Sequence, residues 1–264
     1  MNAGARALLG AFASIVAMGW AMRARPRAAA EDGPPVLMDT AGPKTRARPE
    51  GAVEANDAAT LTRLLADPHG PSVVWIPAVE LVGEFVLARP VAVIGALGAT
   101  LVGTGRGSVV TIDAAGASLE NVYVRHSGQR NTLEDAGIRA KGKDIHIADV
   151  DVRDALFGIS LAGCERCTLE GARVRGSGEG PDSLQGDGIK LWESHGSSVR
   201  RCVVEDSRDV VVWYTRHATL EDNVVRRSRY GTHFMYAHDA VVRNSRFLDD
   251  VVGVFAMYST RVRT

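Results

Sequence analysis

A short hydrophobic pattern recurs six times between residue 117 and the C-terminus. Each copy is six residues long and has an apolar residue at its first and sixth positions. The first positions are Leu119, Ile147, Leu169, Val199, Leu220 and Val242, and the sixth are Val124, Val152, Val174, Val204, Val225 and Phe247. Successive copies start 28, 22, 30, 21 and 22 residues apart. A fixed period of this length predicts a repeat architecture in which each copy packs on the next.

A second apolar segment alternates with the first. Its copies begin at Gly137, Gly158, Gly188, Asp209, Gly231 and Gly253. The two long steps place insertions near residues 128–135 and 178–186. The recurring glycine is typical of a tight turn with positive φ or of a close backbone approach. Asp209 replaces it once, and we expect aspartate there to tolerate the turn geometry.

Two or three short β segments per unit of about 22 residues predict an all-β, right-handed parallel β-helix over residues 56–264. Leucine-rich repeats need a denser leucine pattern, and helical repeats need a 3.6-residue period. The apolar segments between residues 73 and 113 fit shorter, more divergent coils. A helix over Asp57–Ala66 is expected to cap the N-terminal end, where a free strand edge would promote aggregation.

The N-terminal segment differs from the repeats. Residues 1–30 combine Arg6, an apolar run over residues 7–22 and a small-residue site at Ala28–Ala30, which indicates a signal peptide or an N-terminal anchor. Residues 31–55 are rich in Pro, Gly and charge and predict a linker. The pattern of residues 1–30 predicts an exported protein, and no later segment is apolar enough to span a membrane.

Composition excludes some partners and some kinds of stabilisation. The 264 residues carry 31 basic and 31 acidic side chains, which gives none of the basic excess that nucleic-acid binding needs. Three cysteines (Cys164, Cys167 and Cys202) are an odd number and cannot all pair within the chain. We interpret them as structural thiols rather than as a metal site.

Aligned coils bring chemically distinctive residues into columns. One column contains Trp192, Trp213, Met235 and Met257, and His233 lies two residues before Met235 on the same strand face. Thioether and imidazole ligands favour Cu(I), so His233, Met235 and Met257 are candidate copper ligands, to which His238 in the following turn can be added. The alternative is that Met and Trp only fill space in the ladder. Trp192, Trp213, Tyr236 and Tyr258 form a candidate partner or ligand surface.

Enzymatic function is the competing hypothesis, because polysaccharide lyases, epimerases and glycosidases also use β-helices. Its candidate residues are Asp187, Asp209, the pair Asp249–Asp250, and His195. A glycosidase needs two carboxyl groups facing each other across a sugar. The polygalacturonase-like order, in which paired aspartates precede a glycine-flanked histidine and a basic triplet, is absent because His195 comes before Asp249–Asp250. The sequence therefore favours a non-enzymatic protein. The runner-up is a carbohydrate-binding or polysaccharide-modifying β-helix, with Trp192 and Trp213 stacking on sugars.

The segments GDGIKLWES (186–194), RYGTHFMYAHDAVVRNSRF (229–247) and GVFAMYS (253–259) resemble the NosD family. These are periplasmic β-helix proteins that accompany the maturation of nitrous-oxide reductase, and the resemblance covers roughly residues 57–264. It implies an exported accessory protein that works with an ABC transporter permease and ATPase. It also implies a copper chaperone or the multicopper reductase as a partner. The family motif falls on His233, Met235, Tyr236 and Met257.

The repeat also predicts that the last coil is incomplete. The last coil begins at Gly253, and the sequence contains no counterpart of its second strand, Val242–Phe247. We therefore expect a product truncated at the C-terminus, with the His/Met face close to its end.

Overall fold

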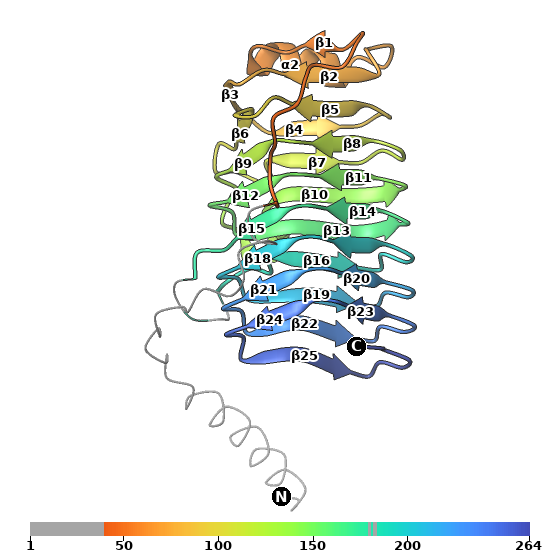
Figure 1. The fold of residues 1–264 in the computed structure, drawn as a ribbon. Helices are drawn as coiled ribbons and strands as arrows, with labels where there is room; N and C mark the ends of the chain where they lie inside the picture. The colour runs from red at the N-terminus through yellow and green to blue at the C-terminus, as the bar shows by residue number, and fades with distance from the viewer. Residues whose placement is uncertain (1–39, 179–180, 182–183) are drawn as a thin grey trace, which may run out of the picture. The chain divides into compact units, whose positions relative to one another are not determined.

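The computed structural model describes residues 40–178, 181 and 184–264 (Figure 1). They form a solenoid of three parallel sheets, in which each coil contributes one strand to each sheet. The predicted signal peptide or anchor, residues 1–30, lies outside the described residues. Among those described, no helix is both long and apolar enough to cross a bilayer.

Sheet A has nine strands in the order of the coils. They are β1 (Val53–Glu54), β2 (Val73–Ile76), β5 (Ala92–Gly95), β8 (Ser118–Glu120), β11 (His146–Ala148), β14 (Thr168–Glu170), β17 (Ser198–Arg200), β20 (Thr219–Glu221) and β23 (Val241–Arg243).

Sheet B has eight strands. They are β3 (Glu80–Val82), β6 (Thr100–Val102), β9 (Tyr123–Arg125), β12 (Asp151–Arg153), β15 (Arg173–Arg175), β18 (Val203–Glu205), β21 (Val224–Arg226) and β24 (Arg246–Leu248).

Sheet C also has eight strands and carries the candidate site. They are β4 (Phe85–Leu87), β7 (Val110–Ile112), β10 (Ala136–Lys143), β13 (Phe157–Glu165), β16 (Ile189–Trp192), β19 (Asp209–Trp213), β22 (Tyr230–Met235) and β25 (Val252–Met257).

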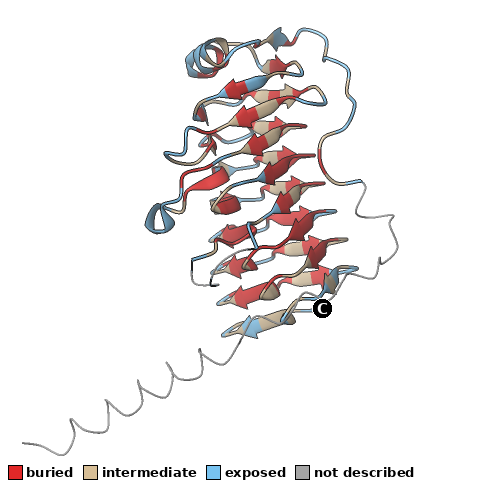
Figure 2. Ribbon diagram, turned by 90° about the vertical axis from the view of Figure 1, so that its left-hand side faces the viewer, coloured by how far each residue is buried: buried red, intermediate tan, exposed pale blue. Residues whose placement is uncertain are grey.

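The two predicted apolar columns form the core (Figure 2). Leu119, Ile147 and Leu169 stand in register on β8, β11 and β14, and their counterparts continue to Val242. The second column runs through sheet B from Val124 to Phe247. The side chains of the first column are at most 6% exposed. The predicted parallel β-helix is therefore confirmed.

The recurring glycines serve close packing rather than positive φ. None of Gly137, Gly158, Gly188, Gly231 and Gly253 has a left-handed backbone. A Cβ on Gly158 would lie 2.2 Å from the carbonyl oxygen of Gly188 in the next coil. Many left-handed residues instead lie in the turns between sheets. The corner between sheets A and B has one in each of six coils, with φ between 49° and 62°: Asn121, Asp149, Gly171, Arg201, Asp222 and Asn244.

The helix α2 (Ala58–Ala66) begins at Asp57, whose side chain accepts a hydrogen bond from the Thr60 N–H at 2.7 Å. Leu61, Leu64 and Leu65 are buried, and they belong to the same hydrophobic core as the coils. This arrangement agrees with the predicted capping helix.

The described part of the expected linker, residues 40–55, lies along the solenoid, and its end forms β1. We call residues 40–48 the strap. The strap crosses the left-handed corner: the Gly42 N–H bonds the Gly171 carbonyl, and Asn121 exchanges hydrogen bonds with the backbone of Lys44. Lys44 and Arg46 both form ion pairs with Asp149. This ordered packing differs from the linker that composition predicts.

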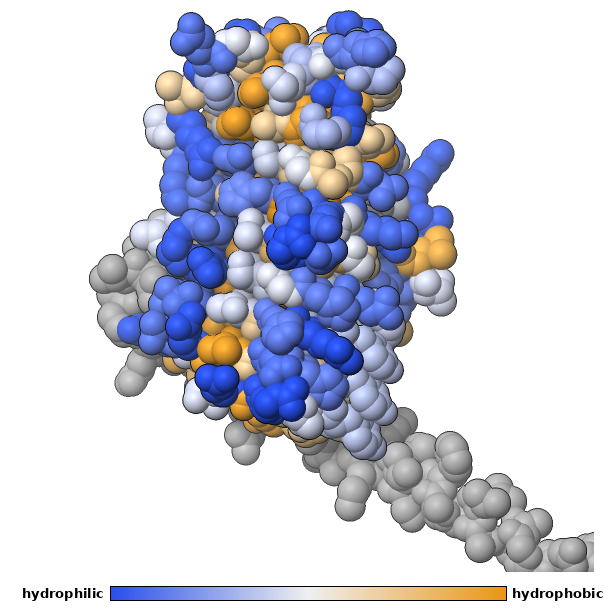
Figure 3. Space-filling model, turned by 90° about the vertical axis from the view of Figure 1, so that its right-hand side faces the viewer, coloured by the Kyte–Doolittle hydropathy of each residue, from blue (hydrophilic) through white to orange (hydrophobic). Residues whose placement is uncertain are grey.

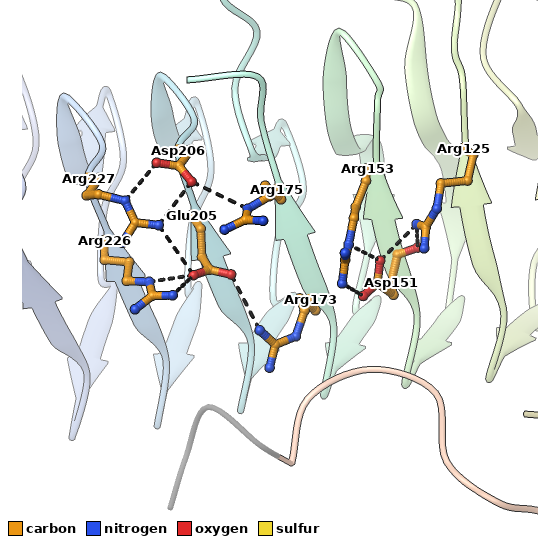
Figure 4. A network of polar contacts seen from close by, with 9 residues as sticks. All are labelled: Arg125, Asp151, Arg153, Arg173, Arg175, Glu205, Asp206, Arg226 and Arg227. Carbon is orange, nitrogen blue, oxygen red and sulfur yellow. Dashed lines mark hydrogen bonds and ion pairs between the residues drawn. The ribbon is translucent and has the colours of Figure 1, made fainter. Parts of the chain in front are cut away.

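The outer face of sheet B carries six arginines and three carboxylates (Figure 4). Asp151 accepts hydrogen bonds from Arg125 and Arg153, and Glu205 forms ion pairs with Arg173, Arg226 and Arg227. Asp151 and Glu205 are 3% and 2% exposed. These arginines therefore neutralise buried carboxylates and join neighbouring coils.

Candidate metal face and aromatic ladder

The register of sheet C produces the two columns that the sequence predicts. Trp192 pairs with Trp213, Trp213 with Met235, and Met235 with Met257. The parallel column pairs Lys190 with Val211, Val211 with His233, and His233 with Phe255. Alternate residues of these strands, such as Leu191 and Val212, belong to the core. Both columns therefore lie on the outer face of sheet C.

His233 is enclosed although it belongs to the outer face. It is 6% exposed, and its ring makes edge contacts with Trp213, Tyr230 and Phe255 at centroid distances of 5.4, 4.9 and 5.3 Å. Its Nδ1 lies 3.3 Å from Oδ2 of Asp209. Its Nε2 is buried and has no hydrogen-bond partner among the described residues. The ring therefore has one occupied and one available nitrogen.

Asp209 does not act as the turn residue expected from the sequence. Its backbone is not left-handed, and it lies within β19 with a fully buried side chain. Both carboxylate oxygens bind Arg229, one of them through Nε at 3.0 Å. Burial favours protonation, but the hydrogen bonds from His233 and Arg229 hold the pKa of Asp209 below its ordinary value. Asp209 is thus a buried carboxylate that orients cationic and imidazole groups.

A second ionic group adjoins this one. Lys190 pairs with Glu134 from the loop that contains the 3₁₀ helix η2 (Asn131–Leu133), and its ammonium lies 5.0 Å from the Trp192 ring centroid. Glu134 belongs to the first predicted insertion, which here reaches across two coils. The second insertion, near 178–186, lies partly outside the described residues.

Two of the carboxyl groups considered for glycoside chemistry, those of Asp187 and Asp209, are engaged by arginines. Asp187 is 2% exposed and bonds Arg208 at 2.9 Å, and burial raises its pKa to about 6. Asp209 is held by Arg229, as described above. Asp249 and Asp250 lie between β24 and β25, at the same corner between sheets B and C as Asp187 and Asp209 but in a later coil. His195 lies in the turn after sheet C, so the width of this sheet separates it from the carboxyl groups.

The donor set of the outer face suits a soft metal ion. Met235 and Met257 are neighbours in register, and the available His233 Nε2 belongs to the strand that carries Met235. The described residues contain no cluster of three or more His, Cys, Asp or Glu side chains arranged to hold a metal. Harder cations, which prefer carboxylates, lack a site there, whereas thioether and imidazole ligands favour Cu(I). The donor types on this face are therefore those that Cu(I) prefers.

We call His233, Met235 and Met257 the candidate metal face. A ladder of aromatic side chains borders this metal face at the turn from sheet C to sheet A. Tyr214, Tyr236 and Tyr258 stack with centroid distances of 5.1 and 5.0 Å and interplanar angles of 9° and 13°. Trp192 extends the ladder, 5.0 Å from Tyr214. Because the ring faces cover one another, the ladder presents edges and hydroxyl groups to solvent, an arrangement poorly suited to sugar stacking.

His238 lies beside this ladder rather than in the column of His233. With His195, Tyr214, Arg216 and Tyr236 it lines an open depression of about 370 Å³. The flank of the solenoid that carries the turns from sheet C to sheet A is predominantly hydrophilic (Figure 3). Its Nδ1 accepts the Thr260 N–H at 3.2 Å. Only Nε2 of His238 is therefore available to a metal.

The three cysteines are buried free thiols. Cys164 and Cys167 lie on the core side of the coils, and the hydroxyls of Ser194 and Ser197 accept their backbone N–H groups. This placement agrees with the structural interpretation.

Residues that sequence reasoning missed are Glu134, Arg229 and Tyr230. Each acts on a residue in another coil or through the ring of His233, so no local motif marks them. The Arg-Tyr-Gly sequence at 229–231 gave a signal, because it places an arginine and an aromatic residue just before the candidate histidine.

Comparisons with known proteins agree with the sequence resemblance. Residues 175–264 match the family described as "Periplasmic copper-binding protein (NosD)". The chain is 32% identical over 130 residues to the "Probable ABC transporter binding protein NosD" of Pseudomonas aeruginosa, a match that covers 48% of this chain and 30% of that protein. The chain thus matches less than a third of that relative's length. The resemblance to NosD is confirmed over this part, and the family's periplasmic description agrees with the predicted location.

Solved structures resemble the solenoid at low sequence identity. The mannuronan C-5 epimerase AlgE6 A-module of Azotobacter vinelandii aligns with a TM-score of 0.58 and 12% identity, covering 86% of this chain and 71% of that one. An alginate lyase from Paenibacillus sp. str. FPU-7 aligns with a TM-score of 0.49 and 12% identity, covering 81% and 99%. The epimerase likeness supports the β-helix fold and nothing further.

Proposed function

From the NosD pattern that residues 175–264 carry, we propose that this chain is a periplasmic accessory protein that handles copper for the maturation of nitrous-oxide reductase. The observation that carries the proposal is the outer face of sheet C, where Met235 and Met257 adjoin in register and His233 keeps a buried nitrogen available. The role is non-enzymatic: the protein binds a soft metal ion and presents it to partners.

In this proposal His233, Met235 and Met257 supply an imidazole and two thioethers to one Cu(I) ion. Soft ligands of this kind retain Cu(I) against the harder cations of the periplasm. Burial of His233 among three aromatic rings keeps water from the ion. In this proposal His238 is an additional ligand from the neighbouring turn, and it binds through Nε2 alone.

The partners in the proposal are an ABC transporter permease and ATPase, and a copper chaperone or the multicopper reductase. Support comes from the Pseudomonas aeruginosa relative, whose name describes an ABC transporter binding protein. The docking surface consists of Trp192, Trp213, Tyr236 and Tyr258, with Tyr214 between them. Trp and Tyr side chains are typical anchors of protein interfaces, and Tyr214, Tyr236 and Tyr258 are exposed here.

Anaerobic titration with Cu(I) against a colorimetric chelator tests the metal site. We expect one Cu(I) per chain, and in the double variant Met235→Leu/Met257→Leu we expect the Kd to rise roughly 10- to 100-fold, as losses of metal-site partners do. Leucine keeps the volume and removes the thioether. His146→Gln, which alters a sheet A histidine bonded to Thr168, is the matched histidine control for His233→Gln and His238→Gln. Unchanged affinity in the methionine variant would exclude these residues as ligands.

A further inference from the structure

Only one of the two ring nitrogens of His233 contacts the carboxylate of Asp209. Its Oδ2 lies 3.3 Å from Nδ1, whereas Nε2 is buried and has no partner among the described residues. Arg229 binds both oxygens of the same carboxylate, and the Tyr230 N–H lies 3.3 Å from Oδ1. An ionised carboxylate only accepts hydrogen bonds, so the atom facing it must be a donor.

The geometry points to Asp209 as a positioning residue that keeps the proton of neutral His233 on Nδ1 and the lone pair on Nε2, ready for a soft metal ion. In metal sites, a carboxylate or carbonyl that accepts from the second ring nitrogen fixes the tautomer and the ring orientation in this way. The metal half of this inference rests on the proposed copper function. The tautomer half stands without it.

An irregularity in the sheet places His233 beside this carboxylate. Asp209 pairs with Tyr230, yet Val211 pairs with His233, so β22 contains one extra residue at this point. Without the extra residue, Thr232 rather than His233 would stand opposite Val211. Bulges of this kind re-aim side chains and occur often beside functional sites.

Packing restrains the orientation of the His233 ring, and the hydrogen bond to Asp209 determines which ring nitrogen carries the proton. Trp213, Tyr230 and Phe255 contact the ring from three directions, so it cannot turn over without displacing them. The carboxylate is itself immobilised by Arg229. Donor, acceptor and ring plane are therefore all set before any metal arrives.

The tautomer can be measured in the metal-free protein. In a long-range ¹H–¹⁵N correlation spectrum of ¹⁵N-histidine-labelled full chain, with His233 assigned from His233→Gln, we expect the Nδ1–H form. In Asp209→Asn the amide oxygen stays with Arg229 and the NH₂ group faces the ring, so His233 should change to the Nε2–H form. Asp187→Asn removes another buried carboxylate that is paired with an arginine, and we expect it to leave the His233 signals in place.

Cu(I) titration of the same proteins tests the consequence. We expect Asp209→Asn to raise the Kd about 10- to 100-fold, and Asp187→Asn to leave it within about twofold. An Nε2–H tautomer of His233 in the wild-type protein overturns the inference, whatever the Asp209→Asn variant shows. A tautomer that changes in Asp209→Asn without any change in Kd overturns the link to metal binding. The expected tautomers with no Cu(I) binding in any protein support the role of Asp209 and reject the proposed copper function.

Discussion

Asp250 follows β24 and illustrates how a single carboxyl group in this solenoid makes stability depend on pH. Its Oδ1 accepts the Ser228 N–H at 2.8 Å, and its Oδ2 is buried and has no partner among the described residues. Burial, together with the neighbouring charge of Asp249, raises the pKa of Asp250 to about 7. The group is thus protonated in the folded protein at a pH where the unfolded chain has already released the proton.

The sign of the effect follows from proton binding. Between about pH 4 and pH 7 the folded state holds more protons at Asp250 than the unfolded state, so the free energy of unfolding falls as pH rises through this window. We expect Asp250→Asn to remove this contribution and to be more stable than wild type at pH 8, by about 1–3 kcal/mol. The two proteins should differ little at pH 4. Urea unfolding at both pH values measures the effect, and the exposed Asp113→Asn is the control. An equal difference at pH 4 and pH 8 would contradict the assignment.

At the level of strands and turns, the sequence allowed the register of the coils to be predicted, because each apolar position recurs with the period. Pairs such as Met235 and Met257 follow from that register directly. Asp209 shows where the prediction ended. The repeat spacing predicted that His233 stands opposite Val211. The contacts of Asp209 with Arg229 and His233 were not predicted, because these partners lie one coil later and no local motif marks them. The glycine positions were predicted, but close approach rather than positive φ explains them.

The strap was not predicted, because it binds through backbone groups and charges and has no apolar period. We expect Lys44→Ala/Arg46→Ala to lower the free energy of unfolding by about 1–3 kcal/mol, since Asp149 is largely buried and loses both cations. Solenoid coils contact mainly their neighbours, so the loss should remain local. Hydrogen exchange should accelerate at the amides of Asn121 and Asp149 and stay unchanged in β22 and β25.

The control for the strap removes two cations from exposed pairs. Lys143 and Arg166 form ion pairs with Glu165 at the surface, and such pairs contribute about 0–1 kcal/mol. Lys143→Ala/Arg166→Ala should therefore have a smaller effect than the strap variant. Exchange that accelerates equally in all coils of the strap variant would show that the strap does not act locally.

For the whole molecule, the solenoid places metal face and aromatic ladder side by side in the same coils. Met235 is followed by Tyr236, and Met257 by Tyr258, so β22 and β25 each end with a thioether on the outer face of sheet C and a phenol at the adjoining turn. These turns lie where sheet C passes to sheet A (Figure 1). Under the proposed function, a partner that docks on the ladder would lie next to His233, Met235 and Met257, which would link binding of the partner to transfer of the ion.

This arrangement predicts that a substitution in the ladder can weaken docking of the partner without changing the affinity for Cu(I). Tyr236 and Tyr258 have left-handed backbones with φ of 52°, a conformation that asparagine tolerates well, so Tyr236→Asn/Tyr258→Asn should fold. We expect the variant to bind Cu(I) as wild type does but to deliver it to the apo multicopper reductase or its chaperone about tenfold more slowly, since the exposed phenols anchor the partner. Stopped-flow transfer from the loaded protein measures the rate, and Tyr123→Asn on sheet B is the control. Equal transfer rates in all three proteins would place the docking surface elsewhere, while a loss of Cu(I) affinity in the double variant would show that the two surfaces are one site.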